Sequence, residues 1–320
     1  AFWLRRMKHW WDENPVYKDN FVRGLYIVDK EKNIIGFIGL IPTFFQFNYK
    51  TEIIYSLTTW RVNKKHRKVS LRMFSQILKE VSKKFLFDTT PTIKVEKILK
   101  AFKFKPLPRS HYHTYIYFLN FTQFFLKRFP LSKKFSFFLK PFFWSINYLQ
   151  DCISKKSGPL QNTVQLFKAG KEFDDLWQET KNRSKNTNVR NADVINWLCF
   201  SGGIANRHLF GSYDKGKLIA YAIFTEITDE SSKQLILSDL WGTKINYEVS
   251  REIFSAAIIF AKSNDFELVV FNSFNCQQDR ALQKMRFFKK SLSQRRYYKS
   301  NNELAKEHTY LSMLQGDYSL

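Results

Sequence analysis

Cysteine is scarce in this 320-residue chain, which contains only Cys152, Cys199 and Cys276. The three lie far apart in the sequence, and none belongs to a Cys-x-x-Cys pair. An odd number of scattered cysteines argues against both a disulfide framework and a structural zinc site, and it is typical of a reducing compartment. We therefore expect a cytoplasmic protein without a bound metal.

Long apolar runs are also lacking. The most apolar stretch, residues 118–149, is interrupted by five lysines and arginines and by two prolines. A membrane-spanning helix needs about 18 or more consecutive apolar residues, so this stretch is not expected to span. No secretory signal pattern opens the chain.

Several catalytic motifs are absent. The sequence has no Gly-x-Ser-x-Gly, His-Glu-x-x-His or Gly-x-x-x-x-Gly-Lys-Ser/Thr motif, which argues against α/β-hydrolases, zinc proteases and P-loop nucleotide hydrolases. His111 and His113 would share one face of a strand, and two histidines can begin a metal site. No third ligand follows at a suitable spacing, so we expect no metal there.

Acidic residues are few, 28 against 52 lysines and arginines, which gives a formal charge of +24 and a pI near 9.8. This balance favours an anionic partner, such as a phosphorylated cofactor, a nucleic acid or an anionic membrane surface, and it is equally compatible with a solvated basic surface.

Apolar residues make up 44% of the chain and include 33 phenylalanines. This composition is typical of a globular protein with an aromatic core.

One order of elements occurs twice, at an offset of roughly 180 residues. The first copy comprises strands at 33–41 and 53–62, a basic turn at 63–70, a helix at 71–85, a strand at 85–87, a helix at 95–102 and a strand at 112–119. The second begins with helices at 172–183 and around Trp197. It continues with strands at 218–224 and 234–240, a helix at 249–260, a strand at 267–272, a helix around 282–285 and a strand near 295–298. The pattern predicts an α/β protein with domains at 1–120 and 161–320.

Residues 121–160, between the predicted domains, form a basic–aromatic segment rich in Phe, Lys and Pro. One interpretation is a patch that rests on anionic lipid or stacks on nucleic acid. The other is a pair of helices packed between the domains.

The order strand, basic turn, helix, strand, helix, strand resembles the GNAT (N-acetyltransferase-like) family. Arg67, within the stretch WRVNKKHRKVSLRMF (60–74), occupies the leading position of that family's Arg/Gln-x-x-Gly-x-Gly/Ala loop. The stretches 99–104 and 282–287 are similar to the family's Leu-x-Lys-x-Gly-Phe helix end, and Trp177, Arg190 and Trp197 resemble a pattern of double-GNAT proteins associated with surface polysaccharides. The resemblance implies two tandem GNAT-like domains, each with a mixed, mostly antiparallel sheet flanked by helices.

The resemblance also implies an acyl-CoA donor whose pyrophosphate lies on backbone N–H groups at a helix N-terminus. Carried onto this sequence, the donor-binding residues are Val62, Arg67, Lys68, Val69, Ser70, Leu71 and Arg72. Ser70 and Arg72 stand where the family has glycine or alanine, and the cations Lys64, Lys65, Lys68 and Arg72 can compensate for that difference. The equivalent turn of the second copy, 241–247, carries only Lys244.

Acyl transfer in this family needs a backbone N–H of the central strand to polarise the thioester, and a base to deprotonate the acceptor amine. Asp239, Glu226 and Glu52 are candidates for the base because they lie near strand ends. The tyrosine that the family places on its last helix is absent from both copies.

The sequence thus predicts an acyltransferase that moves an acyl group, first of all acetyl, from acyl-CoA to an amine, such as an amino sugar or a lipid-linked glycan precursor. Two alternatives remain. One is a Fem-like transferase that uses aminoacyl-tRNA, which the positive charge would suit. The other is a non-catalytic GNAT pair that binds at the inner face of a membrane.

Overall fold

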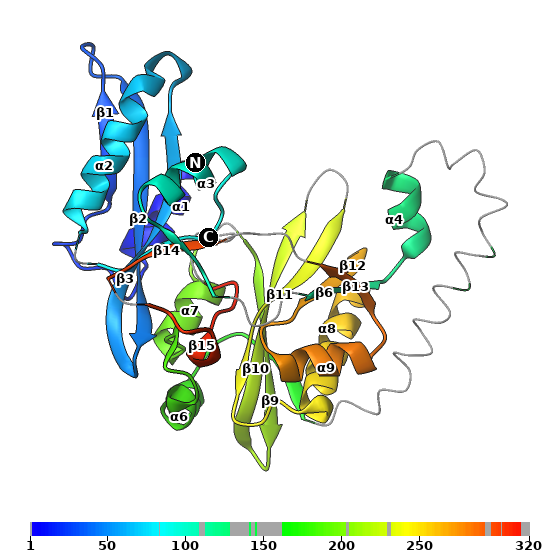
Figure 1. Ribbon diagram of the computed structural model, residues 1–320. Helices are drawn as coiled ribbons and strands as arrows, with labels where there is room; N and C mark the ends of the chain where they lie inside the picture. Colours follow the sequence, from blue (N-terminus) through cyan, green and yellow to red (C-terminus); the bar gives the residue numbers. More distant parts are fainter. Residues whose placement is uncertain are drawn as a thin grey trace. The chain divides into compact units, whose positions relative to one another are not determined.

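The computed structural model describes residues 2–82, 84–108, 113–128, 141, 145, 162–202, 205–228, 232–291, 296–301 and 303–314 (Figure 1). The chain divides into two compact units, each assembled from separate stretches. The first unit comprises Ala1–Arg109, Lys181–Ile204 and Ser293–Leu320, and the second comprises Ser110–Thr180 and Ala205–Leu292. Most of the basic–aromatic segment 121–160 lies outside the described residues, apart from α4 (Phe121–Arg128) and residues 141 and 145.

The first unit contains an eight-stranded mixed sheet. Its strands are β1 (Gly24–Val28), β2 (Ile34–Phe47), β3 (Lys50–Val62), β4 (Leu86–Asp88), β5 (Lys105–Pro106), β8 (Asn186–Asn188), β14 (Tyr297–Lys299) and β15 (Thr309–Tyr310). They run in the order β15-β8-β2-β3-β4-β14-β5, with β1 also paired to β2. Among these pairs, β3–β4 and β8–β15 are parallel and the others antiparallel.

Helices lie on the two faces of this sheet. On one face are α2 (Ser70–Glu80) and α3 (Ile93–Ala101), whose apolar sides form one core with β2 and β3. Phe74 and Ile77 of α2 meet Ile38 and Leu40 of β2 in this core. Helix α1 (Phe2–Met7) and the turn η1 (Lys8–Asp12) precede β1, and α7 (Ala192–Phe200) follows β8. Because side chains alternate along a strand, residues 35 and 37 of β2 face away from α2.

The second unit contains a seven-stranded sheet in the order β13-β6-β12-β11-β10-β9-β7. Its strands are β6 (His113–Phe118), β7 (Thr163–Leu166), β9 (Arg207–Asp214), β10 (Lys217–Thr228), β11 (Lys233–Gly242), β12 (Leu268–Asn272) and β13 (Phe288–Ser291). Its helices, besides α4, include α6 (Lys171–Thr180), α8 (Tyr247–Ser263) and α9 (Cys276–Lys284). Among the described strands of this second sheet, only β11 and β12 pair in parallel. Both units therefore have the predicted α/β architecture.

The two sheets exchange a strand. The strand expected to complete the first domain is β6, and it pairs with β12 and β13 of the second sheet. The strand expected to complete the second domain is β14, and it pairs with β4 and β5 of the first sheet. The units therefore differ from the contiguous ranges 1–120 and 161–320. Periodicity identifies a strand, but it does not identify the strand with which it pairs.

Within the described ranges, no helix has both the length and the apolar character needed to cross a bilayer.

Candidate functional site

Strand β3, at the centre of the first sheet, contains a β-bulge. Thr59 and Trp60 together face the single residue Ile38 of β2. Thr59 has a φ of 50°, which a β-branched residue adopts only under constraint from its surroundings. The extra residue of a bulge is left out of the strand ladder. The bulge therefore interrupts the backbone ladder at the middle of the sheet.

The bulge also reverses the alternation of side chains along β3. Before it, Tyr55 and Leu57 belong to the core under α2, whereas after it Trp60 and Val62 do. Arg61 consequently lies on the face away from α2, beside its register partner Phe37.

Strands β3 and β4 separate next to the bulge. They pair only at Tyr55 with Leu86 and at Ser56 with Phe87, although β3 continues to Val62. A cavity of about 100 Å³ occupies the gap, which we call the splay cavity. It is lined by Ile38, Leu57, Thr58, Thr59, Trp60, Phe74, Asp88, Thr90, Pro91, Thr92 and Val95.

Trp60 lines the splay cavity and carries an unpaired hydrogen-bond donor. Its ring stacks on Phe74, with 4.3 Å between the centroids and 10° between the planes. Its indole N–H is buried and has no hydrogen-bond partner among the described residues. Leaving a buried donor unpaired costs about 1–3 kcal/mol. A ligand carbonyl oxygen that accepts a hydrogen bond from this N–H would remove that cost.

The basic turn after β3 is a 3₁₀ helix, η2 (Lys64–Val69), that leads directly into α2. Asn63 begins the turn by accepting a hydrogen bond from the Lys65 N–H at 3.2 Å. The Ser70 N–H donates to the carbonyl of Arg67, so it is already satisfied within the protein. No acidic residue occupies the first turn of η2 or of α2. An anion at this point would therefore be held mainly by side-chain cations.

The predicted donor-binding residues lie together at the end of β3 that carries the bulge. Val62 ends β3; Arg67, Lys68 and Val69 lie in η2; Ser70, Leu71 and Arg72 form the first turn of α2. Arg67, Lys68 and Arg72 are exposed to solvent. The structure thus places a group of cations beside the splay without assigning a ligand to them.

A second and larger hollow lies on the face away from α2, and we call it the α1-side cavity. Its volume is about 730 Å³. It is lined by Trp3, Met7, Ile34, Ile35, Gly36, Phe37, Thr59, Arg61, Val62, Asn63, Lys64 and Arg67. Thr59 lines both cavities, so the bulge separates them.

The corresponding splay of the second unit is bridged by the protein itself. Strands β11 and β12 pair at 234–236 and 268–270 and then diverge. The Asn272 side-chain N–H donates to the Leu237 carbonyl across the gap at 3.1 Å, and the Thr114 hydroxyl donates to Asn272 Oδ1 at 3.1 Å. The Asn272 amide and the Leu237 carbonyl are therefore hydrogen-bonded to each other and are not left for a ligand in this gap.

The two candidate bases of the second unit have partners within the protein. Asp239 is fully buried and accepts a hydrogen bond from the Tyr221 hydroxyl at 3.0 Å. Glu226 lies 2.7 Å from His208 Nε2 and accepts a hydrogen bond from the Asn206 side chain at 3.2 Å. The two carboxylates occupy different strands, and each is already engaged.

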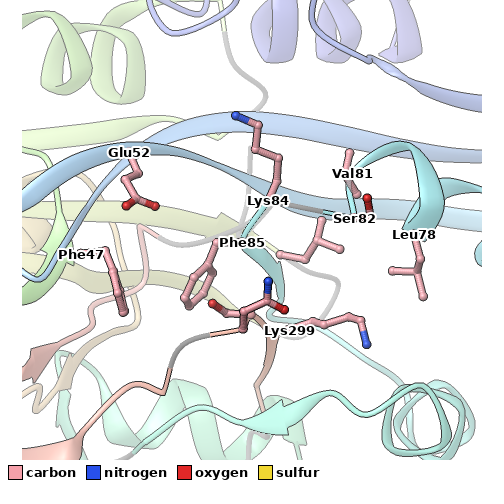
Figure 2. A pocket seen from close by; sticks show the side chains of 11 residues that line it. Phe47, Glu52, Leu78, Val81, Ser82, Lys84, Phe85 and Lys299 are labelled. Atoms are coloured by element: carbon pink, nitrogen blue, oxygen red, sulfur yellow. The ribbon is translucent and has the colours of Figure 1, made fainter.

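Glu52 lies near the start of β3, at the end opposite to the bulge, where it is exposed and paired in register with Phe45. It lines a small cavity of about 100 Å³, in which Figure 2 shows its side chain among those of Phe47, Lys84 and Phe85. Glu52 lies seven positions before Thr59, about 23 Å away along a strand. The structure therefore does not bring Glu52 to the bulge.

A polar cluster that the sequence did not reveal joins β6 to α9. Asp279 lies 3.0 Å from His113 Nδ1 and accepts from the Tyr115 hydroxyl at 2.9 Å. Burial raises the pKa of Tyr115 to about 12, and the Asp279 carboxylate acts in the same direction. Asp279 lies more than 160 positions after His113 and Tyr115 in the sequence, so only the strand exchange brings it to them. His111 lies outside the described residues, and within the described ones no three metal-binding side chains gather.

No protein-family model and no curated protein matches the sequence. Solved structures do match the fold. Yeast (Saccharomyces cerevisiae) N-myristoyltransferase with bound myristoyl-CoA aligns over 89% of this chain and 70% of its own, with a TM-score of 0.53 and 12% identity. The same enzyme with myristoyl-CoA and inhibitors aligns over 98% and 76%, with a TM-score of 0.58 and 11% identity.

A GCN5-related N-acetyltransferase from Anabaena variabilis aligns over 88% of this chain and 63% of its own, with a TM-score of 0.53 and 12% identity. Identities of this size show the fold alone. The predicted architecture is confirmed at that level: the chain shares its fold with these N-acyltransferase structures and contains two GNAT-like domains.

Proposed function

We propose that this protein transfers an acyl group from acyl-CoA to an amino group, with the donor bound in the splay of the first unit. The observation that carries the proposal is the splay itself: β3 and β4 diverge around a cavity at a bulge of the central strand. The similar structures with bound myristoyl-CoA support an acyl-CoA donor.

The residues of the first unit fit such a donor. The backbone of the bulge and the unpaired Trp60 N–H are donors for amide and thioester carbonyl oxygens. Arg67 and the neighbouring exposed cations Lys68 and Arg72 provide positive charge for the donor's phosphates. The limited volume of the splay cavity favours a short acyl group such as acetyl. An amino sugar or a lipid-linked glycan precursor remains our proposed acceptor.

In the proposed reaction the amine nitrogen bonds to the thioester carbonyl carbon, and the carbon–sulfur bond breaks. The amine loses one proton and the departing thiolate gains one. The products are an amide and free coenzyme A, so protons and electrons balance without another reactant.

The test is calorimetric titration with acetyl-CoA and with coenzyme A. We expect Arg67→Ala to weaken acetyl-CoA binding at least tenfold, about 1.4 kcal/mol. Trp60→Phe keeps a ring on Phe74 but removes the N–H, and we expect a similar loss. The matched control is Lys244→Ala, in the equivalent turn of the second unit, which should change the affinity less than twofold. If neither ligand binds, or if only Lys244→Ala weakens binding, the proposal is wrong.

A further inference from the structure

The α1-side cavity combines two kinds of wall. One is apolar and consists of Trp3 and Met7 from α1 with Ile34, Ile35 and Phe37 from β2. The other is cationic and consists of Arg61, Lys64 and Arg67. None of the described residues that line this cavity is acidic. A ligand that matches both walls has an apolar body and an anionic group.

The three cations are available to such a ligand. Within the described part of the chain, Arg61, Lys64 and Arg67 take part in no ion pair. The bulge orients Arg61 toward this side because it reverses the alternation of β3, which places Trp60 and Val62 in the core under α2. The same irregularity therefore shapes the splay cavity and places a cation in the cavity across the sheet.

Exposed apolar side chains lie in the wall of the cavity and on the elements next to it. Ile34 is 70% exposed although it lines the cavity. Tyr26, the register partner of Phe37 on the neighbouring strand β1, is 67% exposed. Next to Trp3 on α1, Leu4 is 74% exposed. An apolar chain or ring that enters this cavity would cover Ile34 and gain burial at about 25 cal/mol per Å².

We propose that the α1-side cavity is the acceptor pocket and that the acceptor is an anionic amphiphile: an amine that carries a phosphate or carboxylate group on an apolar body. The inference rests on the proposed function: this cavity is an acceptor site only if the donor binds in the splay cavity on the other side of Thr59. An acceptor amine bound here reaches the donor at the bulge from the face opposite to α2. Arg61 and Lys64 fix the anionic group, Arg67 serves the donor's phosphates, and the apolar wall holds the body.

Octyl phosphate is the probe, used below its micelle concentration and titrated by calorimetry into the full chain. We expect it to bind at least tenfold more tightly than inorganic phosphate, which lacks the apolar body, and than octanol, which lacks the anion. Inorganic phosphate binding as tightly as octyl phosphate would show that the cations bind any phosphate, and it would overturn the proposal.

Two substitutions test the two walls. Lys64→Gln should weaken octyl phosphate binding at least fivefold, whereas Lys79→Gln, the same change on the exposed end of α2, should change it less than twofold. Trp3→Ala should weaken octyl phosphate binding at least fivefold and leave acetyl-CoA binding within twofold of the wild type. Equal effects of Lys64→Gln and Lys79→Gln would mean that long-range charge, and not the cavity, holds the probe.

A competition experiment separates this inference from the proposed function. Octyl phosphate and acetyl-CoA should bind the same protein molecule together, because their sites lie on opposite sides of the bulge. Competitive displacement of one by the other would place the probe in the donor site and overturn the acceptor assignment while leaving the donor site intact. Octyl phosphate binding that depends on Lys64, in a protein that does not bind acetyl-CoA, would leave an amphiphile site and reject the transferase.

Discussion

At the scale of single residues, several positions that resemble family signatures have structural roles in this protein. The Trp197 indole N–H donates to the His9 carbonyl at 2.8 Å. Arg190 is buried, donates to Thr187 and to the Asn188 carbonyl at 2.7 and 2.6 Å, and lies over the ring of Tyr310. These side chains hold the first unit together. Sequence signatures therefore identified the fold here without identifying the reacting groups.

Asp279 gives a residue-scale prediction about pH. Burial alone would raise its pKa, but hydrogen bonds from Tyr115, His113 and Ser273 outweigh burial, and the pKa lies below its usual value. A carboxyl group with a lowered folded-state pKa contributes stability above its unfolded pKa of about 3.9, and that contribution is lost as the pH falls through the folded value. We expect Asp279→Asn to lower the free energy of unfolding by about 1–3 kcal/mol at pH 7.

Urea unfolding at pH 7, 5 and 3 checks this expectation. The difference between the wild type and Asp279→Asn should be similar at pH 7 and 5 and smaller at pH 3. Asp214→Asn, the same change at an exposed position of β9, should have little effect at any of these values. An Asp279→Asn difference as large at pH 3 as at pH 7 would contradict the role assigned to the ionised carboxylate.

At the scale of elements, the sequence predicted the long helices and strands but not the irregularities that make the site. The apolar spacing located α2 and α8, and the basic turn after β3 was visible as a run of neighbouring cations. The expected strand at 33–41 was too short, since β2 continues to Phe47. Apolar residues on both faces of this strand hide the two-residue alternation that would locate its end. The bulge, the splay and the unpaired Trp60 N–H depend on strand register, which one sequence does not encode locally.

The bulge supports an element-scale prediction about stored strain. Thr59 has a φ of 50°, and a non-glycine residue in this region costs about 1–3 kcal/mol. Its side chain borders two cavities, so little packing is lost when it is removed. We expect Thr59→Gly to raise the free energy of unfolding by about 1 kcal/mol, measured in urea. Thr58, the neighbouring residue, is buried and does not have a positive φ. Thr58→Gly should therefore lower the free energy of unfolding by about 1 kcal/mol or more. Destabilisation by both changes would show that the Thr59 side chain contributes more than its backbone costs.

At the scale of the whole molecule, the strand exchange makes each unit depend on distant parts of the chain. Strand β14 pairs with β4 and β5 of the first unit, and it follows the last strand of the second unit in sequence. Tyr297 and Tyr298 are both buried in the first unit, and Tyr298 stacks on Phe85 with 5.4 Å between the ring centroids. The first unit therefore cannot complete its sheet until the second has been synthesised.

This dependence gives the prediction at the largest scale. A chain ending at Ser291 lacks β14 and β15, and we expect its first unit to lose hydrogen-exchange protection in β4 while β10, β11 and β12 of the second unit stay protected. In the full chain, Tyr298→Ala should weaken the same region, because removing a buried aromatic ring typically costs about 3–5 kcal/mol. Uniform loss of protection in both units would mean that they unfold as one body, and unchanged protection of β4 would mean that β14 is dispensable. Selective loss of protection in the first unit would show that β14 stabilises the first sheet, although β14 follows the second unit in sequence. The first sheet is the one in which we place the donor site.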